Sequence, residues 1–219
     1  MARIRLDVVS DVVCPYCWLG KARLDAALAA NPDLDVEVAY RPFQLDPNVP
    51  REGLGAYEYM HARFGPALNR IRQSQAQLRA AAAAAGIHYR FDEIPRQPNT
   101  FDAHRLIRWA HAEGKGAEVV EALFRAHFDE LRDVGDPQVL ADIGGAAGLD
   151  RDVIAQRLAS GEDSREVADE EAFFRQLGVS AVPTFIAEGA IAVQGAQDSA
   201  VLANFLRQAA MMASDTRMA

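Results

Sequence analysis

The chain has 219 residues, of which half are hydrophobic and a quarter charged. This balance is that of a globular protein with a sizeable core, and the length predicts one domain or one domain with a large insertion. The 31 acidic residues outnumber the 23 basic ones, giving a formal net charge of −8. Because no local basic cluster offsets this charge, nucleic acid is not an expected partner.

The sequence shows no targeting or membrane-spanning segment. Charged side chains at every second position of residues 3–7 interrupt the apolar region that a signal peptide needs. The most apolar run, residues 80–85, is six alanines, far short of the ~20 apolar residues of a spanning helix. We therefore expect a cytoplasmic protein without a membrane partner, although a mature chain that had lost a signal peptide would look the same.

The first forty residues predict a strand, a helix and a second strand. Apolar and polar side chains alternate over residues 3–9, as in a half-buried strand. Pro15 stands where a helix can begin, because the first helical position tolerates a missing N–H. Helical spacing then continues over residues 18–30, and residues 36–40 alternate again.

The rest of the chain divides into a helical part and a short strand-rich part. Residues 56–177 show mostly helical patterns, whereas residues 182–187 and 190–193 have strand character. The two strand-like runs flank Glu188-Gly189, a two-residue hairpin signal. Asp198 precedes a last helical pattern and is a suitable N-cap. The predicted order is therefore βαβ, about 135 residues of helices, and ββα.

The strongest chemical signal is Cys14-Pro15-Tyr16-Cys17 at the junction of the first strand and helix. A cysteine just before a helix lies near unpaired backbone N–H groups and the positive end of the helix dipole, which favour its thiolate. Cys17, one turn further in, has the spacing to attack a mixed disulfide on Cys14. The pattern predicts Cys14 as the nucleophile and Cys17 as the resolving cysteine.

The cysteine pair has two other interpretations. A zinc site normally needs four ligands, and the chain contains no second cysteine pair. The histidines show no paired i,i+3 or i,i+4 ligand spacing; they are His61, His88, His104, His111 and His127. The cysteines could also be inert core residues, but a pair at a helix start after a strand is more often redox-active. We therefore expect no metal.

Several segments together resemble the DsbA family of the thioredoxin superfamily, and most closely its cytoplasmic FrnE-like branch. They occur in the family's order and span nearly the whole chain. They are Ser10-Asp11 with Cys14-Pro15-Tyr16-Cys17-Trp18-Leu19-Gly20-Lys21, Asn99-Thr100-Phe101-Asp102-Ala103-His104-Arg105-Leu106, Gly178-Val179-Ser180-Ala181-Val182-Pro183-Thr184-Phe185, and Gly195-Ala196-Gln197.

The resemblance implies an α/β thioredoxin-like fold, with a central four-stranded mixed sheet and a large all-α insertion domain. The thioredoxin-like domain would comprise residues 1–42 and 178–219, and the insertion residues 43–177. The resemblance further implies that Pro183 is cis and faces Cys14. The Val182 backbone would then pair with the substrate strand that carries the target disulfide.

Two differences from relatives bear on the chemistry. Tyr16 stands where strongly oxidising periplasmic relatives have histidine, so we expect a less acidic Cys14 and a less oxidising disulfide. Kappa-class glutathione transferases and hydroxychromene-carboxylate isomerases have serine at the Cys14 position, and cysteine here favours thiol–disulfide exchange. The loop with Gln197 and Asp198 still resembles theirs, which implies a possible site for a glutathione γ-glutamyl group beside a helix start.

The remaining candidates concern substrate contact. Pro15 and Tyr16, between the cysteines, are expected at the substrate surface. Trp18, His104 and Asn99 are further candidates, although packing is the ordinary role of a tryptophan or histidine on a helix. A stripe of Tyr57, Met60 and Phe64 at helical spacing is expected in the core unless it is exposed as a peptide-binding patch.

The sequence thus predicts a thiol–disulfide oxidoreductase or isomerase that acts on protein or low-molecular-weight disulfides and dithiols. It would need no bound cofactor, with glutathione or another small thiol as a possible co-substrate. A glutathione-dependent transferase or isomerase of small molecules is the alternative enzyme, and a non-catalytic binding module that keeps the fold is a third hypothesis. The protein is expected to be a monomer or a homodimer.

Overall fold

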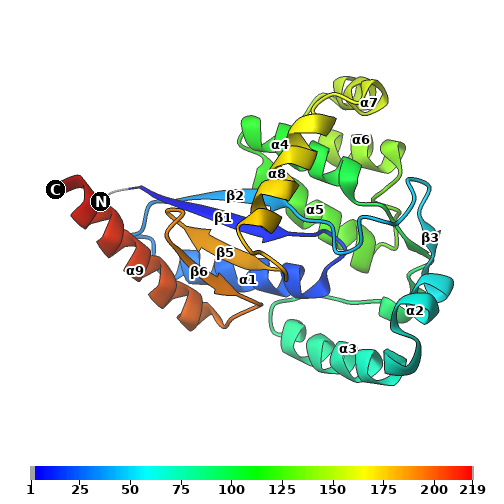
Figure 1. Ribbon diagram of the computed structural model, residues 1–219, viewed down its shortest axis with the longest axis horizontal. Helices are drawn as coiled ribbons and strands as arrows, with labels where there is room; N and C mark the ends of the chain where they lie inside the picture. Colours follow the sequence, from blue (N-terminus) through cyan, green and yellow to red (C-terminus); the bar gives the residue numbers. More distant parts are fainter. Residues whose placement is uncertain (1–2, 219) are drawn as a thin grey trace.

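The computed structural model describes the backbone of residues 3–218 and the side chains of residues 3–214. A four-stranded sheet has the order β2-β1-β5-β6, formed by Val36–Pro42, Ile4–Ser10, Thr184–Ala187 and Ile191–Gln194. Strand β1 is parallel to β2 and antiparallel to β5, and β5 is antiparallel to β6. The sheet is therefore mixed and joins the two ends of the chain, as the resemblance implies (Figure 1).

Helices make up most of the remaining chain. The α-helices are α1 (Pro15–Ala29), α2 (Ala56–Phe64), α3 (Leu68–Ala83), α4 (Phe101–Ala112), α5 (Gly116–Phe128), α6 (Pro137–Ala146), α7 (Arg151–Ser160), α8 (Ser164–Gln176) and α9 (Ser199–Met218). Helices α2 to α8 lie between β2 and β5 in the sequence, so the helical part interrupts the βαβ and ββα halves of the sheet domain.

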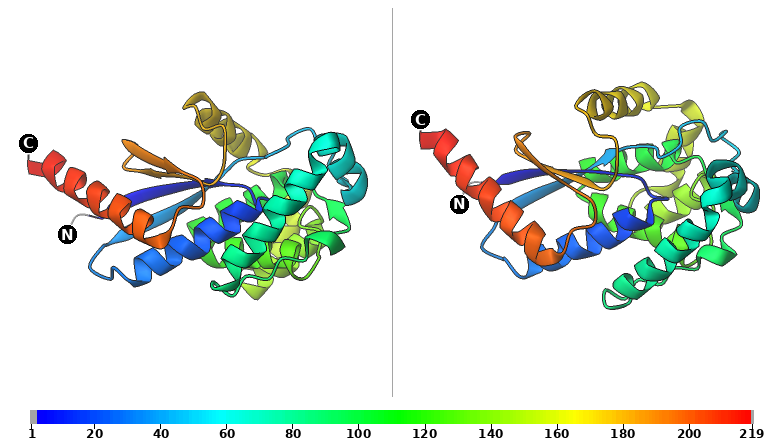
Figure 2. Two further views of the ribbon diagram at one scale, coloured as in Figure 1. Left: turned by 90° about the horizontal axis from the view of Figure 1, so that it is seen from below. Right: turned by 60° about the horizontal axis from the view of Figure 1, so that its bottom comes forward.

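The sheet separates two layers of helices. Helices α1 and α9 cover one face, and α8 lies over the other (Figure 2). The apolar positions of β1 explain this, because Ile4, Leu6 and Val8 point into the larger core while Val9 joins a smaller cluster on the α8 side. The larger core continues without a break into α4 and α5. The helical part and the sheet therefore share one hydrophobic core.

The predicted hairpin is confirmed. Ala190 N–H donates to Ala187 O across Glu188 and Gly189, whose φ angles are 54° and 64°. Two positive φ values are what a type I′ turn requires, and they match the right-handed twist of the paired strands. This turn sets the register of β5 and β6.

Two features of residues 43–100 differ from the sequence-based expectation. A small antiparallel pair, β3 (Leu54–Gly55) with β4 (Arg96–Gln97), was not predicted, because two-residue strands leave no periodicity to detect. The expected core position of the Tyr57 stripe is wrong: none of the residues of α2 is buried, and Tyr57 is 70% exposed. Within residues 3–218, no helix is long and apolar enough to cross a membrane.

Candidate active site

Cys14 lies at the N-terminal end of α1 and forms its N-cap. Its backbone is extended, with φ −90° and ψ 111°, and its carbonyl accepts the Cys17 N–H at 3.0 Å. Pro15 occupies the first helical position, as predicted from its missing N–H. The side chain of Cys14 makes no capping hydrogen bond to the amides of the first turn.

Cys17 lies one turn inside the helix, and both cysteines are thiols. Only 2% of the surface of Cys17 is exposed, against 4% for Cys14. Burial raises the pKa of the Cys17 thiol well above its ordinary value, and the hydrogen bond and charge of Cys14 raise this pKa further. The buried thiol therefore stays protonated until a reaction changes its surroundings, as expected of a resolving cysteine.

The turn before β5 forms the wall opposite Cys14. The Cys14 thiol points at the Val182 carbonyl, with 3.6 Å between sulfur and oxygen, and the Val182–Pro183 peptide bond is cis. Both expectations from the resemblance agree with this geometry. No backbone hydrogen bond within residues 3–218 involves the Val182 amide, which leaves this N–H for an added strand.

Gly20 allows α1 to approach the Val182–Pro183 turn closely. A Cβ at Gly20 would lie 2.9 Å from Cγ of Pro183 and 3.4 Å from Cζ of Phe185. The first distance is shorter than carbon atoms tolerate. Glycine at this position therefore sets how near α1, with its two cysteines, comes to the segment that contains Pro183.

An aromatic cluster packs α1, the helix that carries the cysteines, against α5 and Tyr89. The Trp18 ring stacks on Phe124 and Phe128 of α5, and its Nε1–H donates to Glu121 Oε1 at 3.1 Å. Tyr89 packs edge-on against the same ring and donates its hydroxyl to Pro15 O at 2.6 Å. With 3% of its surface exposed, Trp18 holds α1 against the helical part and presents no open face to a substrate.

Other predicted site residues lie in different surroundings. Tyr16 is 42% exposed beside the cysteines, and its hydroxyl shares a 2.6 Å hydrogen bond with Ser74 of α3. Asn99 uses its amide to hold a loop, donating to Val49 O at 2.6 Å and accepting from Phe101 N–H. The Asn99 side chain thus positions the start of α4. None of these contacts joins it to Cys14.

The predicted glutathione loop lies before α9. Asp198 is an exposed carboxylate that pairs with Arg23 of α1, with 2.9 Å between Oδ1 and Nη2. The same guanidinium donates to Ala196 O at 2.5 Å. Gln197 donates to Gln194 O and so folds back on its own loop. Asp198 and Arg23 therefore form a polar site at the end of β6, whereas Gln197 contributes to loop structure.

His104 is buried in α4 and faces Asp11, which lies in the turn between β1 and α1. Sequence reasoning used Asp11 only as part of the family motif, and it did not single out Tyr89 or Glu121. Ser10 and Asp11 are polar residues between the apolar Val8-Val9 and Val12-Val13, a pattern that could have drawn attention to Asp11. No group of three or more candidate ligands for a metal lies together within the described part of the chain.

A mixed sheet with a dithiol at the start of its first helix, facing a cis-proline turn, defines a thioredoxin-fold protein of the thiol–disulfide oxidoreductase class. The family model described as a DSBA-like thioredoxin domain matches residues 5–207, so the chain belongs to that family. The structure of a probable DsbA oxidoreductase from Streptomyces coelicolor is similar, with 35% sequence identity and a TM-score of 0.86. The match covers 94% of this chain and 89% of that one.

Two more distant structures share the fold. One is a 2-hydroxychromene-2-carboxylate isomerase, with 18% identity, a TM-score of 0.72, and coverage of 97% of this chain and 98% of that one. The other is the cytosolic disulfide reductase DsbM from Pseudomonas aeruginosa with glutathione, with 22% identity and a TM-score of 0.59. This match covers 97% of this chain and 99% of the DsbM chain. The same architecture thus serves thiol exchange and isomerisation.

Proposed function

We propose that the protein exchanges disulfides with protein or low-molecular-weight thiol substrates through Cys14 and Cys17, in the manner of the FrnE-like branch. The observation that carries this proposal is the position of the Cys14 sulfur, at the start of α1 and 3.6 Å from Val182 O, with the protonated Cys17 one turn behind it. Position 14 is cysteine here, whereas the kappa-class transferases and hydroxychromene-carboxylate isomerases have serine, and this difference supports thiol–disulfide exchange over isomerisation.

The reaction has two displacement steps. The Cys14 thiolate attacks a substrate disulfide, so that one substrate sulfur leaves as a thiolate and the other stays bonded to Cys14. Cys17 then attacks the Cys14 sulfur, the second substrate sulfur leaves, and a Cys14–Cys17 bridge remains. Two molecules of a cellular thiol such as glutathione reduce this bridge and become a disulfide. The reverse sequence oxidises a dithiol.

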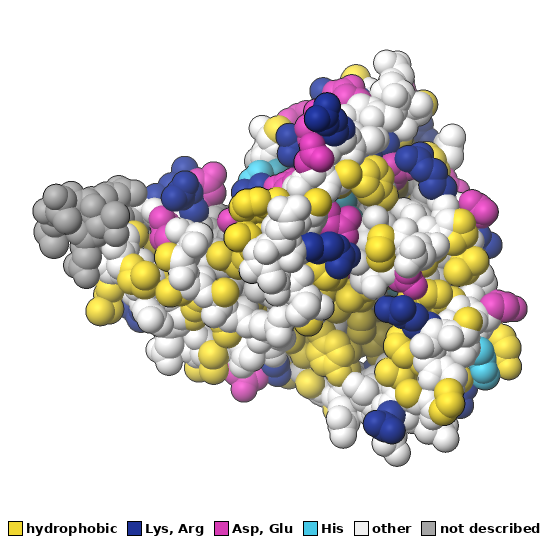
Figure 3. Space-filling model, viewed as in Figure 1, with side chains coloured by type: hydrophobic (Ala, Val, Ile, Leu, Met, Phe, Trp, Pro, Cys, Tyr) yellow, Lys and Arg dark blue, Asp and Glu magenta, His cyan; other side chains and the backbone are white. Residues whose placement is uncertain are grey.

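Two features of the surface support an extended, partly apolar peptide as a substrate. The Val182 amide can pair with a substrate backbone, because the protein itself does not use it in a backbone hydrogen bond. Exposed apolar side chains come from α1, the loop after β2, β3 and α2; they are Tyr16, Leu45, Leu54 and Tyr57. Hydrophobic side chains also gather around the hollow between α3 and the rest of the molecule (Figure 3). Apolar patches of this kind commonly mark interaction sites.

The cytoplasm is the proposed compartment, and a reducing compartment keeps a dithiol ready to attack disulfides. The cytosolic location named for the Pseudomonas relative supports this. Cell fractionation with a tagged chain tests the location directly, and recovery in the periplasmic or secreted fraction would contradict it.

Variants of the two cysteines test the exchange mechanism. Cys14→Ser should abolish insulin reduction, because no nucleophile remains. Cys17→Ser should stop turnover after the first step and accumulate a mixed disulfide on Cys14, visible as an added substrate mass that dithiothreitol removes. Full turnover by Cys17→Ser without a trapped adduct would refute the two-cysteine mechanism.

A glutathione-dependent transferase or isomerase is a second candidate, favoured by the exposed Asp198–Arg23 pair next to the start of α9. A free carboxylate oxygen there could bind the ammonium group of a γ-glutamyl moiety. Asp198→Ala should then weaken glutathione binding in a calorimetric titration. Asp33→Ala is the matched control, because Asp33 is also exposed and paired with an arginine, Arg207. Equal binding by wild type and Asp198→Ala would remove this site from consideration.

A further inference from the structure

One stretch of the helical part carries positive charge in an acidic chain. Residues 59–91 contain five arginines and neither aspartate nor glutamate, although the whole chain has a formal net charge of −8. Helix α3 lies within this stretch and contributes Arg70, Arg72 and Arg79. A local excess of one sign attracts charges of the other sign, so α3 attracts anions that the rest of the protein repels.

Two arginines of α3 have no partner in the protein. Among the basic side chains of residues 3–214, only Arg51, Arg70 and Arg72 lack a carboxylate oxygen within 4.0 Å. Arg70 and Arg72 are exposed and form no hydrogen bond within the same residues. Their guanidinium groups therefore keep all their N–H donors for an anion from outside the protein.

The other three arginines of the stretch are already engaged. They face carboxylates of neighbouring segments: Arg63 lies 3.9 Å from Asp46, Arg79 lies 2.7 Å from Asp92, and Arg90 lies 2.6 Å from Glu93. Because an anion from outside would have to compete with these carboxylates, the free arginines of α3 are the better binding groups.

The two free arginines of α3 lie on different sides of the helix. Residues four apart share one side, and the row that begins with Arg70 continues with Ser74, Leu78 and Ala82. Leu78 and Ala82 are the buried residues of α3, so this row faces the rest of the molecule. The row that begins with Arg72 is exposed over its next two turns and faces solvent.

Ser74 connects the Arg70 side of α3 to the dithiol. Its hydroxyl shares a 2.6 Å hydrogen bond with that of Tyr16, which stands between the two cysteines in the sequence. Arg70 follows one helical turn, about 5 Å, further along the row. Figure 3 shows basic side chains at the edge of the hollow beside α3, around which hydrophobic side chains gather. A substrate that lies along α3 from the cysteines therefore meets Arg70 next.

We propose that α3 is a docking surface for an acidic polypeptide segment next to the substrate disulfide, and that Arg70 binds its carboxylates. The proposal rests on the proposed function and specifies which protein substrates it favours. An extended substrate strand advances ~3.3 Å per residue, so acidic side chains a few residues from the substrate cysteine can reach Arg70.

A polypeptide suits this surface better than a small anionic disulfide. The unused Val182 amide offers pairing to a backbone, and the apolar side chains exposed around the hollow offer area that a small disulfide does not cover. The acidic remainder of the protein repels an acidic substrate elsewhere, so the charge of α3 also orients its approach.

Peptide disulfides measure this preference. Each is a short peptide whose central cysteine is bonded to 2-thiopyridine, and the set differs only in having glutamate, glutamine or lysine on both sides of the cysteine. When Cys14 attacks the peptide sulfur, pyridine-2-thione leaves with the electron pair and is followed by absorbance. The glutamate peptide should react about three- to tenfold faster than the glutamine peptide, and the lysine peptide more slowly. These differences should shrink in ~0.5 M salt, which screens exposed charges.

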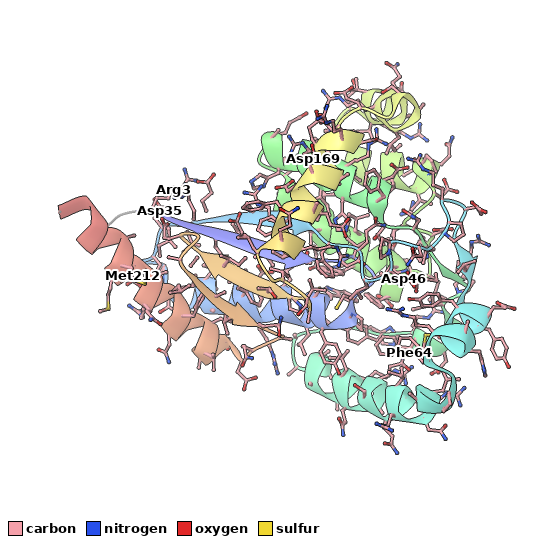
Figure 4. The ribbon with its side chains drawn as sticks, viewed as in Figure 1. Arg3, Asp35, Asp46, Phe64, Asp169 and Met212 are labelled. Carbon is pink, nitrogen blue, oxygen red and sulfur yellow. The ribbon has the colours of Figure 1, made fainter. Side chains whose placement is uncertain are left out.

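Charge reversals on α3 locate the docking surface. Arg70→Glu should abolish the preference for the glutamate peptide. Arg72→Glu is the matched control, because it makes the same charge change at an equally free arginine that faces solvent, and it should keep most of the preference. Arg165→Glu is a second control on α8. Arg165 pairs with Asp169, which lies on the opposite side of the sheet from α3 (Figure 4), and its reversal should leave the preference unchanged.

A binding assay separates docking from redox chemistry. The protein with both Cys14→Ser and Cys17→Ser should bind a fluorescent glutamate peptide without a disulfide more tightly than its glutamine counterpart, as read by anisotropy at low salt. Adding Arg70→Glu should remove this difference. If no peptide disulfide releases thione but the difference in binding remains, the docking surface is supported and the exchange function is refuted.

Three results would overturn the docking surface. Equal rates for the glutamate and glutamine peptides would show that the wild type does not select acidic substrates. Equal losses in Arg70→Glu, Arg72→Glu and Arg165→Glu would show an effect of net charge alone. A larger loss in Arg70→Glu with glutathione disulfide than with the glutamate peptide would assign Arg70 to a small anionic disulfide instead.

Discussion

Replacing Gly20 by alanine tests the close approach of α1 to the cis-proline turn. The new Cβ would lie 2.9 Å from Pro183 Cγ, about 0.6–1.1 Å inside the best carbon–carbon distance. The proline ring can move its Cγ only by a change of ring pucker. Alanine gains about 1 kcal/mol from helix propensity, while overpacking costs about 1–3 kcal/mol. The net effect should be a loss of about 1 kcal/mol, or ~2–4 °C in Tm for a chain of this size.

The same substitution should change reactivity. Because the overlap lies between the helix that carries the cysteines and the segment next to Val182, Gly20→Ala should slow insulin reduction more than reaction with a small aromatic disulfide. Urea unfolding and the two rate measurements are the assays. Gly144→Ala is the control, since its Cβ would overlap Ile154 Cδ1 between α6 and α7. It should lose stability but keep both rates. A Gly20→Ala protein with wild-type stability and rates would refute the packing argument.

Two further predictions concern stability. Burial lowers the pKa of His127 to about 4, so the unfolded chain binds a proton that the folded one excludes, and stability should fall by about 3 kcal/mol as pH drops from 6.5 to 4. In His127→Gln, the difference between urea midpoints at pH 7 and pH 4.5 should shrink, and an unchanged difference would contradict this. Tyr89→Phe removes the 2.6 Å hydrogen bond to Pro15 O and should cost about 1 kcal/mol in urea unfolding. Equal midpoints for Tyr89→Phe and wild type would show that this bond has no net effect.

The elements of the sheet could be predicted because their signals are local. The alternation in β1, the proline at the start of α1 and the Glu188-Gly189 turn each determine a conformation within a few residues. The order of strands in the sheet is different, because β1 pairs with β5 across most of the chain. Only the family resemblance carried that information.

The exposed helix α2 shows why burial could not be predicted. The spacing of Tyr57, Met60 and Phe64 indicates one apolar side of a helix, but the pattern does not say what covers it. In the structure, α2 packs against α3, β3 and β4, and Asp46 from the loop after β2 pairs with Arg63 at 3.9 Å. Figure 4 shows Asp46 and Phe64 at this end of the molecule.

The dithiol could be recognised in the sequence, but the residues that support it could not. Cys14 and Cys17 are recognisable because their spacing carries their chemistry. Asp11 and His104 are distant in sequence, and each alone resembles an ordinary surface or helix residue. Their significance comes from burial and from a 3.6 Å approach that only the folded chain creates.

The order in which the sheet is made has a consequence for the timing of activity during synthesis. The ribosome produces the strand and both cysteines first, but the Val182–Pro183 segment that faces Cys14 follows about 170 residues later. At ~5–20 residues per second, the ribosome needs roughly ten to thirty-five seconds to reach this segment after the cysteines. A nascent chain stalled before β5 would therefore display both cysteines without the Val182–Pro183 segment that faces Cys14. Under the proposed exchange mechanism, the dithiol therefore gains the backbone that would pair with a substrate strand only after this late segment has been made.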